Sequence, residues 1–198
     1  MGKYRYILAS GSPRRRELLE KVIPEYEVIP AEGEEIAFET KTWNLVEELS
    51  FQKASEIFNK IFINDTDRLV VIGADTVVSY NHRVLGKPKD RKEAKEMLKQ
   101  LSGNTHVVYT GVTIYYVDDK GIPQHVTFNE ETHVDVALMS EAEIDNYLAT
   151  GEADDKAGAY GIQGMFAIFI SGIRGDYYNV VGLPIARLYK ELKALNLA

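Results

Sequence analysis

The chain of 198 residues contains no cysteine and a single tryptophan, and it has no apolar run of membrane-spanning length. The lack of cysteine excludes disulfides, cysteine-ligated zinc and thiol nucleophiles. A transmembrane helix needs roughly 18 or more consecutive apolar residues, so we expect no membrane partner. The first residues, 1–6, also lack the apolar stretch and cleavage site of a signal peptide. We therefore expect a cytoplasmic protein.

Positive charge is scarce as well, since 23 Lys and Arg stand against 30 Asp and Glu, for a formal net charge of −7. Affinity for nucleic acids comes largely from Lys and Arg that neutralise phosphates, so this balance argues against a nucleic-acid partner. A small phosphate ligand would instead require locally gathered cations and a divalent metal. The length and the 45% hydrophobic content suit one compact core, and we expect residues 1–198 to form a single domain.

Strand and helix patterns alternate along the chain, which predicts an α/β fold with a mixed twisted sheet flanked by helices. A continuous apolar run over 69–74 is typical of a strand buried on both faces. Strands are predicted at 4–9, 26–29, 69–74, 77–80, 83–85, 106–117, 124–138 and 166–170. Helices are predicted at 13–22, 41–61, from the cap Asp90 to Leu101, from the cap Ser140 onwards, and from Pro184 onwards.

The first unusual feature is a run of three arginines, Arg14 to Arg16, directly after the small residues of 10–13. These arginines fall in the first turn of a predicted helix, where the helix dipole disfavours cations by a few tenths of a kcal/mol up to about 1 each. The free N–H groups of a helix N-terminus bind anions. The turn is therefore either a solvated basic surface or a phosphate site whose ligand offsets the arginine charge.

Two further charged residues occupy places where apolar side chains are expected. Lys53 lies at helical spacing with Val46, Leu49 and Ile57, so it either extends past the rim of the core or faces a negative ligand. Asp75 follows the apolar run that predicts a buried strand. Because ligands bind at the carboxyl ends of strands in open α/β sheets, this carboxylate could hold a hard cation or orient a water. The ordinary alternative is a turn residue.

Weaker signals come from an acidic loop and a glycine-punctuated segment. Glu34 and Glu35 could supply metal ligands, although acidic loops are usually only solvated, and Lys87 is an isolated cation at the end of a predicted hairpin. Glycines recur at every third position over 158–164, which favours close backbone approach. Gln163, within this segment, can both donate to and accept from the edge of a base.

Six segments, in this order along nearly the whole chain, resemble the Maf family of nucleoside-triphosphate pyrophosphatases. They are residues 8–15, 73–77, 86–88, 101–103, 156–164 and 180–184. The resemblance implies hydrolysis of a nucleoside triphosphate to the monophosphate and pyrophosphate with Mg²⁺ or Mn²⁺. It also implies a fold like that of the inosine-triphosphate pyrophosphatases, and a homodimer.

The same resemblance implies roles for individual residues. Those matching the phosphate-binding turn are Ser10, Gly11, Ser12, Arg14 and Arg15. Those matching cationic groups of the cleft are Lys53 and Lys87, and Glu35 matches an acidic residue of the metal site. Asp75 matches the residue proposed as general base, and it would also hold the metal with Glu35. The expected catalytic set is Asp75, Lys53 and Arg14.

Two positions bear on the substrate. Thr76 after Asp75, and Gln163 inside Gly-Ile-Gln-Gly, resemble the branch of the family associated with dTTP and UTP, whereas a branch associated with 7-methyl-GTP differs at both places. The expected substrates are therefore dTTP, UTP and modified pyrimidine nucleotides. Two alternatives stay open at this point: a pyrophosphatase for inosine or other damaged purine nucleotides, and a nucleotide-binding regulator of septum formation and cell division.

Overall fold

The computed structural model describes residues 4–35, 41–62 and 68–198. The strands are β1 (Arg5–Leu8), β2 (Glu27–Val28), β3 (Leu69–Tyr80), β4 (Arg83–Leu85), β5 (Thr105–Val117), β6 (Pro123–Val136) and β7 (Ile170–Arg174). The α-helices are α1 (Pro13–Glu20), α2 (Thr42–Phe62), α3 (Arg91–Leu101), α4 (Glu141–Leu148), α5 (Tyr177–Val181) and α6 (Ile185–Ala194), and two 3₁₀ helices are η1 (Ala157–Ala159) and η2 (Met165–Phe169). No helix among the described residues is long and apolar enough to span a bilayer.

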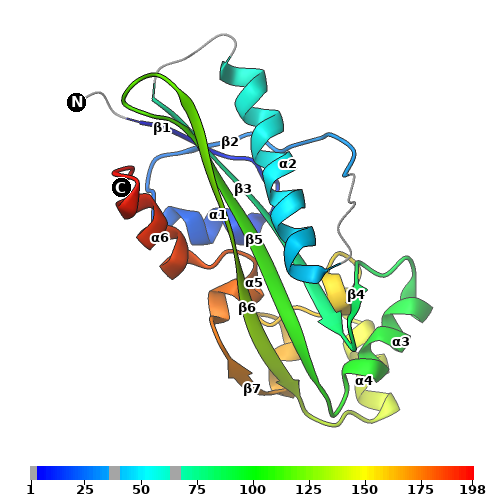
Figure 1. Ribbon diagram of the computed structural model, residues 1–198. Helices are drawn as coiled ribbons and strands as arrows, with labels where there is room; N and C mark the ends of the chain where they lie inside the picture. The colour runs from blue at the N-terminus through cyan, green and yellow to red at the C-terminus, as the bar shows by residue number, and fades with distance from the viewer. Residues whose placement is uncertain (1–3, 36–40, 63–67) are drawn as a thin grey trace. The chain divides into compact units, whose positions relative to one another are not determined.

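The strands form one sheet in the order β2-β1-β3-β5-β6-β7, with β4 beside β3 (Figure 1). Strand β1 pairs in parallel with both β2 and β3. In contrast, β3 pairs with β4, and β6 with β7, in the antiparallel direction. Both pair directions in one sheet, with helices beside it, confirm the predicted mixed α/β fold.

The chain divides into two compact units. The first consists of residues 1–75, 110–130 and 182–198, and the second of residues 76–109 and 131–181. Strands β3, β5 and β6 each contribute a segment to both units. That residues 1–198 act as a single domain stays a prediction.

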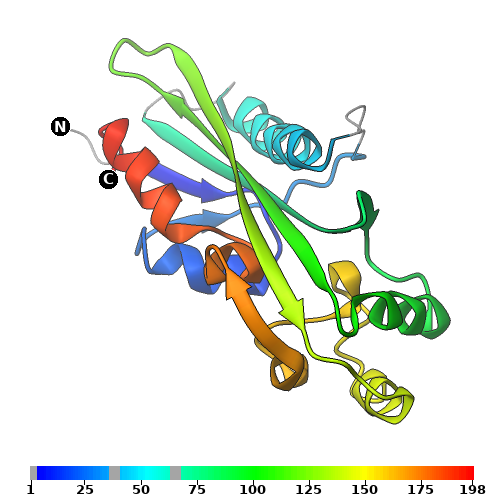
Figure 2. The same ribbon diagram turned by 60° about the horizontal axis from the view of Figure 1, so that its bottom comes forward.

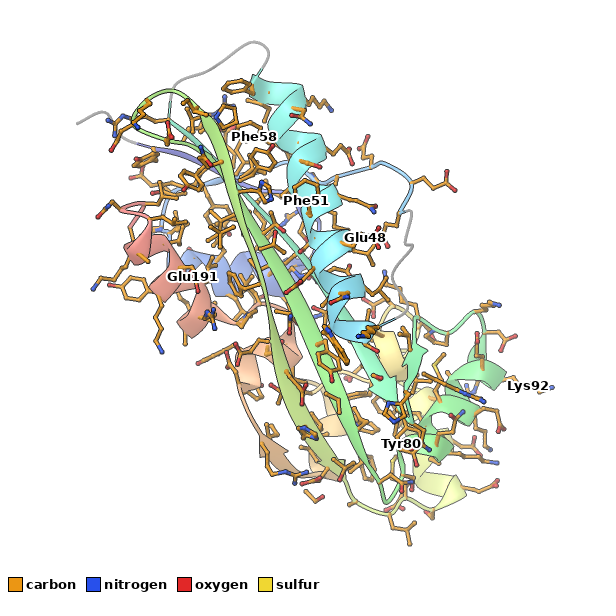
Figure 3. All side chains as sticks on the ribbon, in the orientation of Figure 1. Glu48, Phe51, Phe58, Tyr80, Lys92 and Glu191 are labelled. Carbon is orange, nitrogen blue, oxygen red and sulfur yellow. The ribbon has the colours of Figure 1, made fainter. Side chains whose placement is uncertain are left out.

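The core of the first unit lies under helix α2. In Figures 1 and 2 this helix runs along one face of the strands, while α1 and α6 lie on the other. Figure 3 shows Phe51 and Phe58 on the side of α2 that faces the β5–β6 hairpin, and the Phe58 ring stacks on Tyr115 with 4.2 Å between centroids. The buried residues of this core are Ile7, Ala9, Ala54, Ile57, Phe58, Leu69, Val71 and Val117.

Two glycines allow the backbone of α2 to touch the sheet. A Cβ on Gly73 in β3 would lie 2.7 Å from the amide nitrogen of Ala54, and one on Gly111 in β5 would lie 2.8 Å from that of Glu47. Real Cβ atoms do not approach so closely, so only glycine fits at either place. This contact brings the turn of α2 that carries Lys53 against β3 beside Gly73.

The second unit is built on helices α3 and α4, which pack on each other (Figure 2). Lys95 of α3 donates to both carboxylate oxygens of Asp145 in α4 at 2.8 Å. The predicted helix starts are confirmed, because Asp90 caps α3 and Ser140 forms a capping box with Glu143 at the start of α4.

The prediction that Asp75 ends its strand is wrong. Residues 69–74 and 77–80 are parts of one strand, β3, which runs through Asp75 to Tyr80. The strand that ends is β1, whose last residue Leu8 pairs with Ile72. Asp75 therefore lies three residues beyond the carboxyl end of the neighbouring strand. The position of Asp75 relative to the end of β1 depends on how the two strands pair. The sequence of β3 alone does not reveal that pairing.

The predicted strand at 166–170 is also wrong over most of its length. Residues 165–169 form the helix η2, and β7 begins only at Ile170. An apolar run resembles a buried strand, but here Phe166 is fully buried while Ile168 is 76% exposed. The Phe166 ring packs on Tyr160 with 4.8 Å between centroids, so only part of this apolar run faces the core. The short helix α5 was not predicted either.

The close approach at Gly73 predicts that Gly73→Ala destabilises the protein by about 1–3 kcal/mol, because the added methyl group overpacks the contact with α2. The free energy of unfolding from urea titration measures this effect. Gly86→Ala is the matched control, since a Cβ there meets no described atom within 4 Å. Equal stability of the two variants would contradict the account of the helix contact.

Candidate active site

The turn between β1 and α1 holds its polar groups in a fixed arrangement. Ser12 is the N-cap of α1, and its hydroxyl accepts from the amide of Arg15 at 3.5 Å. Pro13 occupies the first helical position, where its fixed φ suits the helix and no N–H is lost. The buried Ser10 accepts from the amide of Ser12 at 3.3 Å through its Oγ. The loop therefore delivers the N-terminus of an eight-residue helix directly after the end of β1.

The three arginines of this helix lie in different surroundings. Arg15 is the inward one: its Nε donates to the carbonyl of Gly182 at 2.8 Å and its Nη1 to Ser10 Oγ at 3.1 Å. Burial lowers the pKa of the Arg15 guanidinium, and the Asp75 carboxylate acts in the opposite direction. Arg14 is half-buried and Arg16 is exposed. Arg15 thus also ties the turn to the segment before α6, whereas Arg16 faces solvent.

Lys53 joins two carboxylates from separate segments of the first unit. Its Nζ lies 2.6 Å from Asp75 Oδ1 in β3 and 2.9 Å from Glu35 Oε1 in the loop after β2. The Lys53 and Asp75 side chains are only 17% and 13% exposed, while that of Glu35 is 55% exposed. A lysine on the inward stripe of α2 is thus paired with carboxylates, which is what a largely buried ammonium requires.

The loop that carries Glu35 is fastened to the same helix. The carboxylate of Glu56, one turn after Lys53 on α2, accepts from the amides of Glu32 at 3.0 Å and Gly33 at 3.1 Å. Charge-assisted bonds of this kind are stronger than neutral ones. Glu56 was not predicted from the sequence. Glu56 lies three residues after Lys53, so the sequence places the two on the same side of the helix. Acidic residues are common on helices, so this spacing alone does not identify Glu56.

The arrangement of Glu35 and Asp75 fits a divalent cation. Each carboxylate contacts the Lys53 ammonium through one oxygen, so carboxylate oxygens from two separate segments lie near one another. Among the described residues, no group of three or more His, Asp or Glu could hold a metal. Two carboxylates are nevertheless sufficient for Mg²⁺, which commonly keeps water and takes substrate phosphate oxygens as its other ligands.

The remaining predicted residues belong to the second unit. Thr76 follows Asp75 in β3 and is half-buried, while Lys87 and Gln163 are exposed. Lys87 lines a pocket of about 370 Å³ between β4 and α3. The first unit therefore holds Ser10, Gly11, Ser12, Arg14, Arg15, Glu35, Lys53 and Asp75, and the second unit holds Thr76, Lys87 and Gln163. Within the first unit, direct contacts join Lys53 to Asp75 and Glu35, and Arg15 to Ser10 and Ser12.

The glycine-punctuated segment around Gln163 packs against side chains of its own unit. Gly158 has a φ of 68°, and a Cβ there would lie 3.0 Å from Val78. The close backbone approach predicted from the glycines therefore occurs. At Gly158 the approaching group is a strand side chain. Tyr160 is buried, and its hydroxyl lies 2.8 Å from Nε2 of the buried His106 in β5. The segment is thus anchored in the core of its unit.

These features define an α/β protein in which a helix N-terminus with arginines shares a unit with a lysine-bridged pair of carboxylates. The chain belongs to the family described as Maf-like protein, which matches residues 5–195. It is 51% identical over 197 residues to the dTTP/UTP pyrophosphatase of Agathobacter rectalis, covering 96% of each chain. It is also 52% identical over 190 residues to the dTTP/UTP pyrophosphatase of Bacillus cytotoxicus, covering 96% of this chain and 94% of that one.

Among solved structures, the chain is similar to a nucleoside-triphosphatase / dITP/XTP pyrophosphatase from Mycobacterium abscessus. The TM-score is 0.48 at 14% identity, covering 96% of this chain and 97% of that one. Similarity at this level carries no functional conclusion.

The buried His106 predicts a pH dependence of stability. Burial lowers its pKa from 6.5 to about 4, so between these values the unfolded chain binds a proton that the folded chain does not. Stability is therefore retained above about pH 6.5 and falls as the pH drops towards 4, by about 2 kcal/mol between pH 7 and pH 5 from this group.

The free energy of unfolding at the two pH values, compared with that of His106→Asn, isolates the contribution of this histidine. The variant keeps a hydrogen-bonding side chain but does not titrate, so it should lose about 2 kcal/mol less on acidification. The same loss in both proteins would show that His106 is protonated in the folded state.

Proposed function

We propose that this chain hydrolyses nucleoside triphosphates, with dTTP and UTP as substrates, to the nucleoside monophosphate and pyrophosphate. The observation that carries the proposal is the Lys53 ammonium between Glu35 and Asp75, in the same unit as the arginine-bearing turn of α1. The relatives named dTTP/UTP pyrophosphatase, at 51% and 52% identity over nearly the whole chain, support the same reaction.

The turn from Ser10 to Arg15 is assigned to the triphosphate. The half-buried Arg14 supplies hydrogen bonds and positive charge for phosphate oxygens, and the partial positive charge at the start of α1 adds to it. Lys53 adds a cation that is already held in place by two carboxylates. Phosphoryl transfer depends mainly on positioning and charge neutralisation, and these groups provide both.

Asp75 is assigned to the attacking water. Lys53 binds its Oδ1, so Oδ2 is the oxygen that would accept a proton from water. The water oxygen attacks the α-phosphorus, and the bond from this phosphorus to the oxygen bridging to the β-phosphate breaks. Pyrophosphate leaves with that oxygen, and the water proton passes through the carboxylate to solvent.

Glu35 and Asp75 would hold Mg²⁺ or Mn²⁺. When bound, the metal supplies neutralisation of the negative charge on the phosphate oxygens. The metal requirement stays a prediction, as do the homodimer, the lack of a nucleic-acid partner and the cytoplasmic location. The roles of Lys87 towards the phosphates, and of Thr76 and Gln163 in selection of the pyrimidine base, are proposed from the sequence resemblance alone.

Asp75→Asn should reduce pyrophosphate release from dTTP by at least about 100-fold, because the amide cannot take the water proton. The variant keeps the shape of the side chain and an acceptor for Lys53. The assay is pyrophosphate release from a panel of dTTP, UTP, dCTP, dATP, GTP and ITP with Mg²⁺ or Mn²⁺. Asp119→Asn, whose side chain is 78% exposed, is the control. Near-native turnover of Asp75→Asn would remove the assignment.

Arg14→Ala should raise the KM for dTTP about 10-fold or more, since a hydrogen bond to a charged group contributes about 1.5–3 kcal/mol. Arg16→Ala is the matched control, because Arg16 is the exposed neighbour on the same helix turn. Arg15 is less suitable, since its loss would also release Gly182 and Ser10. Identical kinetic constants for the two variants would contradict a phosphate role for the turn.

A further inference from the structure

Gln163 presents an exposed side chain from a short turn of the second unit. An exposed, rotamer-rich side chain discriminates between ligands only when the backbone that carries it is held in one position. The groups that hold the backbone on both sides of Gln163 therefore determine how well this residue can select a base.

On the C-terminal side, the holding group is the carboxylate of Glu152. Both of its oxygens accept from the amide of Met165, at 2.9 and 3.2 Å. A Cβ on Gly164 would lie 2.7 Å from the carboxyl carbon of Glu152, so this carboxylate fills the space that the glycine leaves. Met165 begins η2, and its amide is one that no earlier turn of the helix can satisfy.

On the N-terminal side, the holding groups are Tyr147 and Lys156. The Tyr147 hydroxyl accepts from the amide of Gly161 at 3.3 Å. The aliphatic part of the Lys156 side chain packs on Gly161, since a Cβ on Gly161 would lie only 2.8 Å from Lys156 Cε. The Lys156 ammonium in turn donates to the carbonyl of Glu152 at 2.7 Å. The contacts on the two sides of Gln163 are thus linked through Glu152.

We propose that Glu152 is a positioning residue for base selection. Its carboxylate fixes the Gly164–Met165 backbone, so that the amide of Gln163 meets the edge of the pyrimidine at one place. Thymine presents an O4 acceptor where cytosine presents an N4 donor, and a fixed amide distinguishes the two better than a mobile one. The inference rests on the proposed function, which assigns base selection to Gln163.

The test compares kcat and KM for dTTP and dCTP in the wild type, Glu152→Ala and Glu152→Gln. Glu152→Ala should raise the KM for dTTP and lower the dTTP-to-dCTP ratio of kcat/KM about tenfold. Glu152→Gln should keep the ratio within about threefold, because its amide oxygen still accepts from Met165. Asp154→Ala, an exposed acidic residue of the same turn, is the control and should keep the wild-type ratio.

A second readout does not use activity. Amide hydrogen exchange at Met165 should be faster in Glu152→Ala than in the wild type and Asp154→Ala, because the acceptor is lost. An equal loss of kcat/KM on dTTP and dCTP would indicate only general loosening and would overturn the proposal, as would unchanged exchange. A wild-type protein that releases no pyrophosphate from any nucleotide would overturn the proposed function itself, and the role in base selection with it.

Discussion

The candidate site of the first unit depends on one electrostatic arrangement, in which the Lys53 ammonium lies between the carboxylates of Asp75 and Glu35. A largely buried lysine without partners would be costly, and two carboxylates beside each other would repel. Each charge therefore makes the others acceptable. The same arrangement presents carboxylate oxygens and a cation together, which is the combination that a metal-bound polyphosphate requires.

The backbone around this cluster is shaped to bring it together. Gly73 and Gly111 let α2 touch β3 and β5, because a Cβ at either position would collide with the helix backbone. This close contact allows Lys53 to reach Asp75. Glu56 fastens the acidic loop to the same helix. Arg15 joins the turn after β1 to the segment at Gly182. In the second unit, the Glu152 carboxylate accepts from a backbone amide beside Gln163, as the Glu56 carboxylate accepts from amides of the acidic loop.

Much of the fold could be predicted from the sequence because its signals are local. The helix caps, the long amphipathic helix and the β5–β6 hairpin are determined by residues that are close in sequence. Lys53 on an inward helix face was likewise a local anomaly, for which the sequence left open a place at the rim of the core or a negative ligand. Its pairing with Asp75 and Glu35 depends on residues distant in sequence. The end of β1 opposite Ile72, the 3₁₀ helix at 165–169 and the contacts of Glu56 and Glu152 depend on residues distant in sequence. Local patterns cannot contain these contacts.

The most direct test of the central claim is a crystal structure of the protein with Mn²⁺ and a dTTP analogue that cannot be cleaved between the α- and β-phosphates. The account predicts anomalous scattering from Mn²⁺ at about 2.1 Å from carboxylate oxygens of both Glu35 and Asp75, with the triphosphate on the turn from Ser10 to Arg15. A fully bound analogue whose phosphates and metal contact neither this turn nor these carboxylates would contradict it.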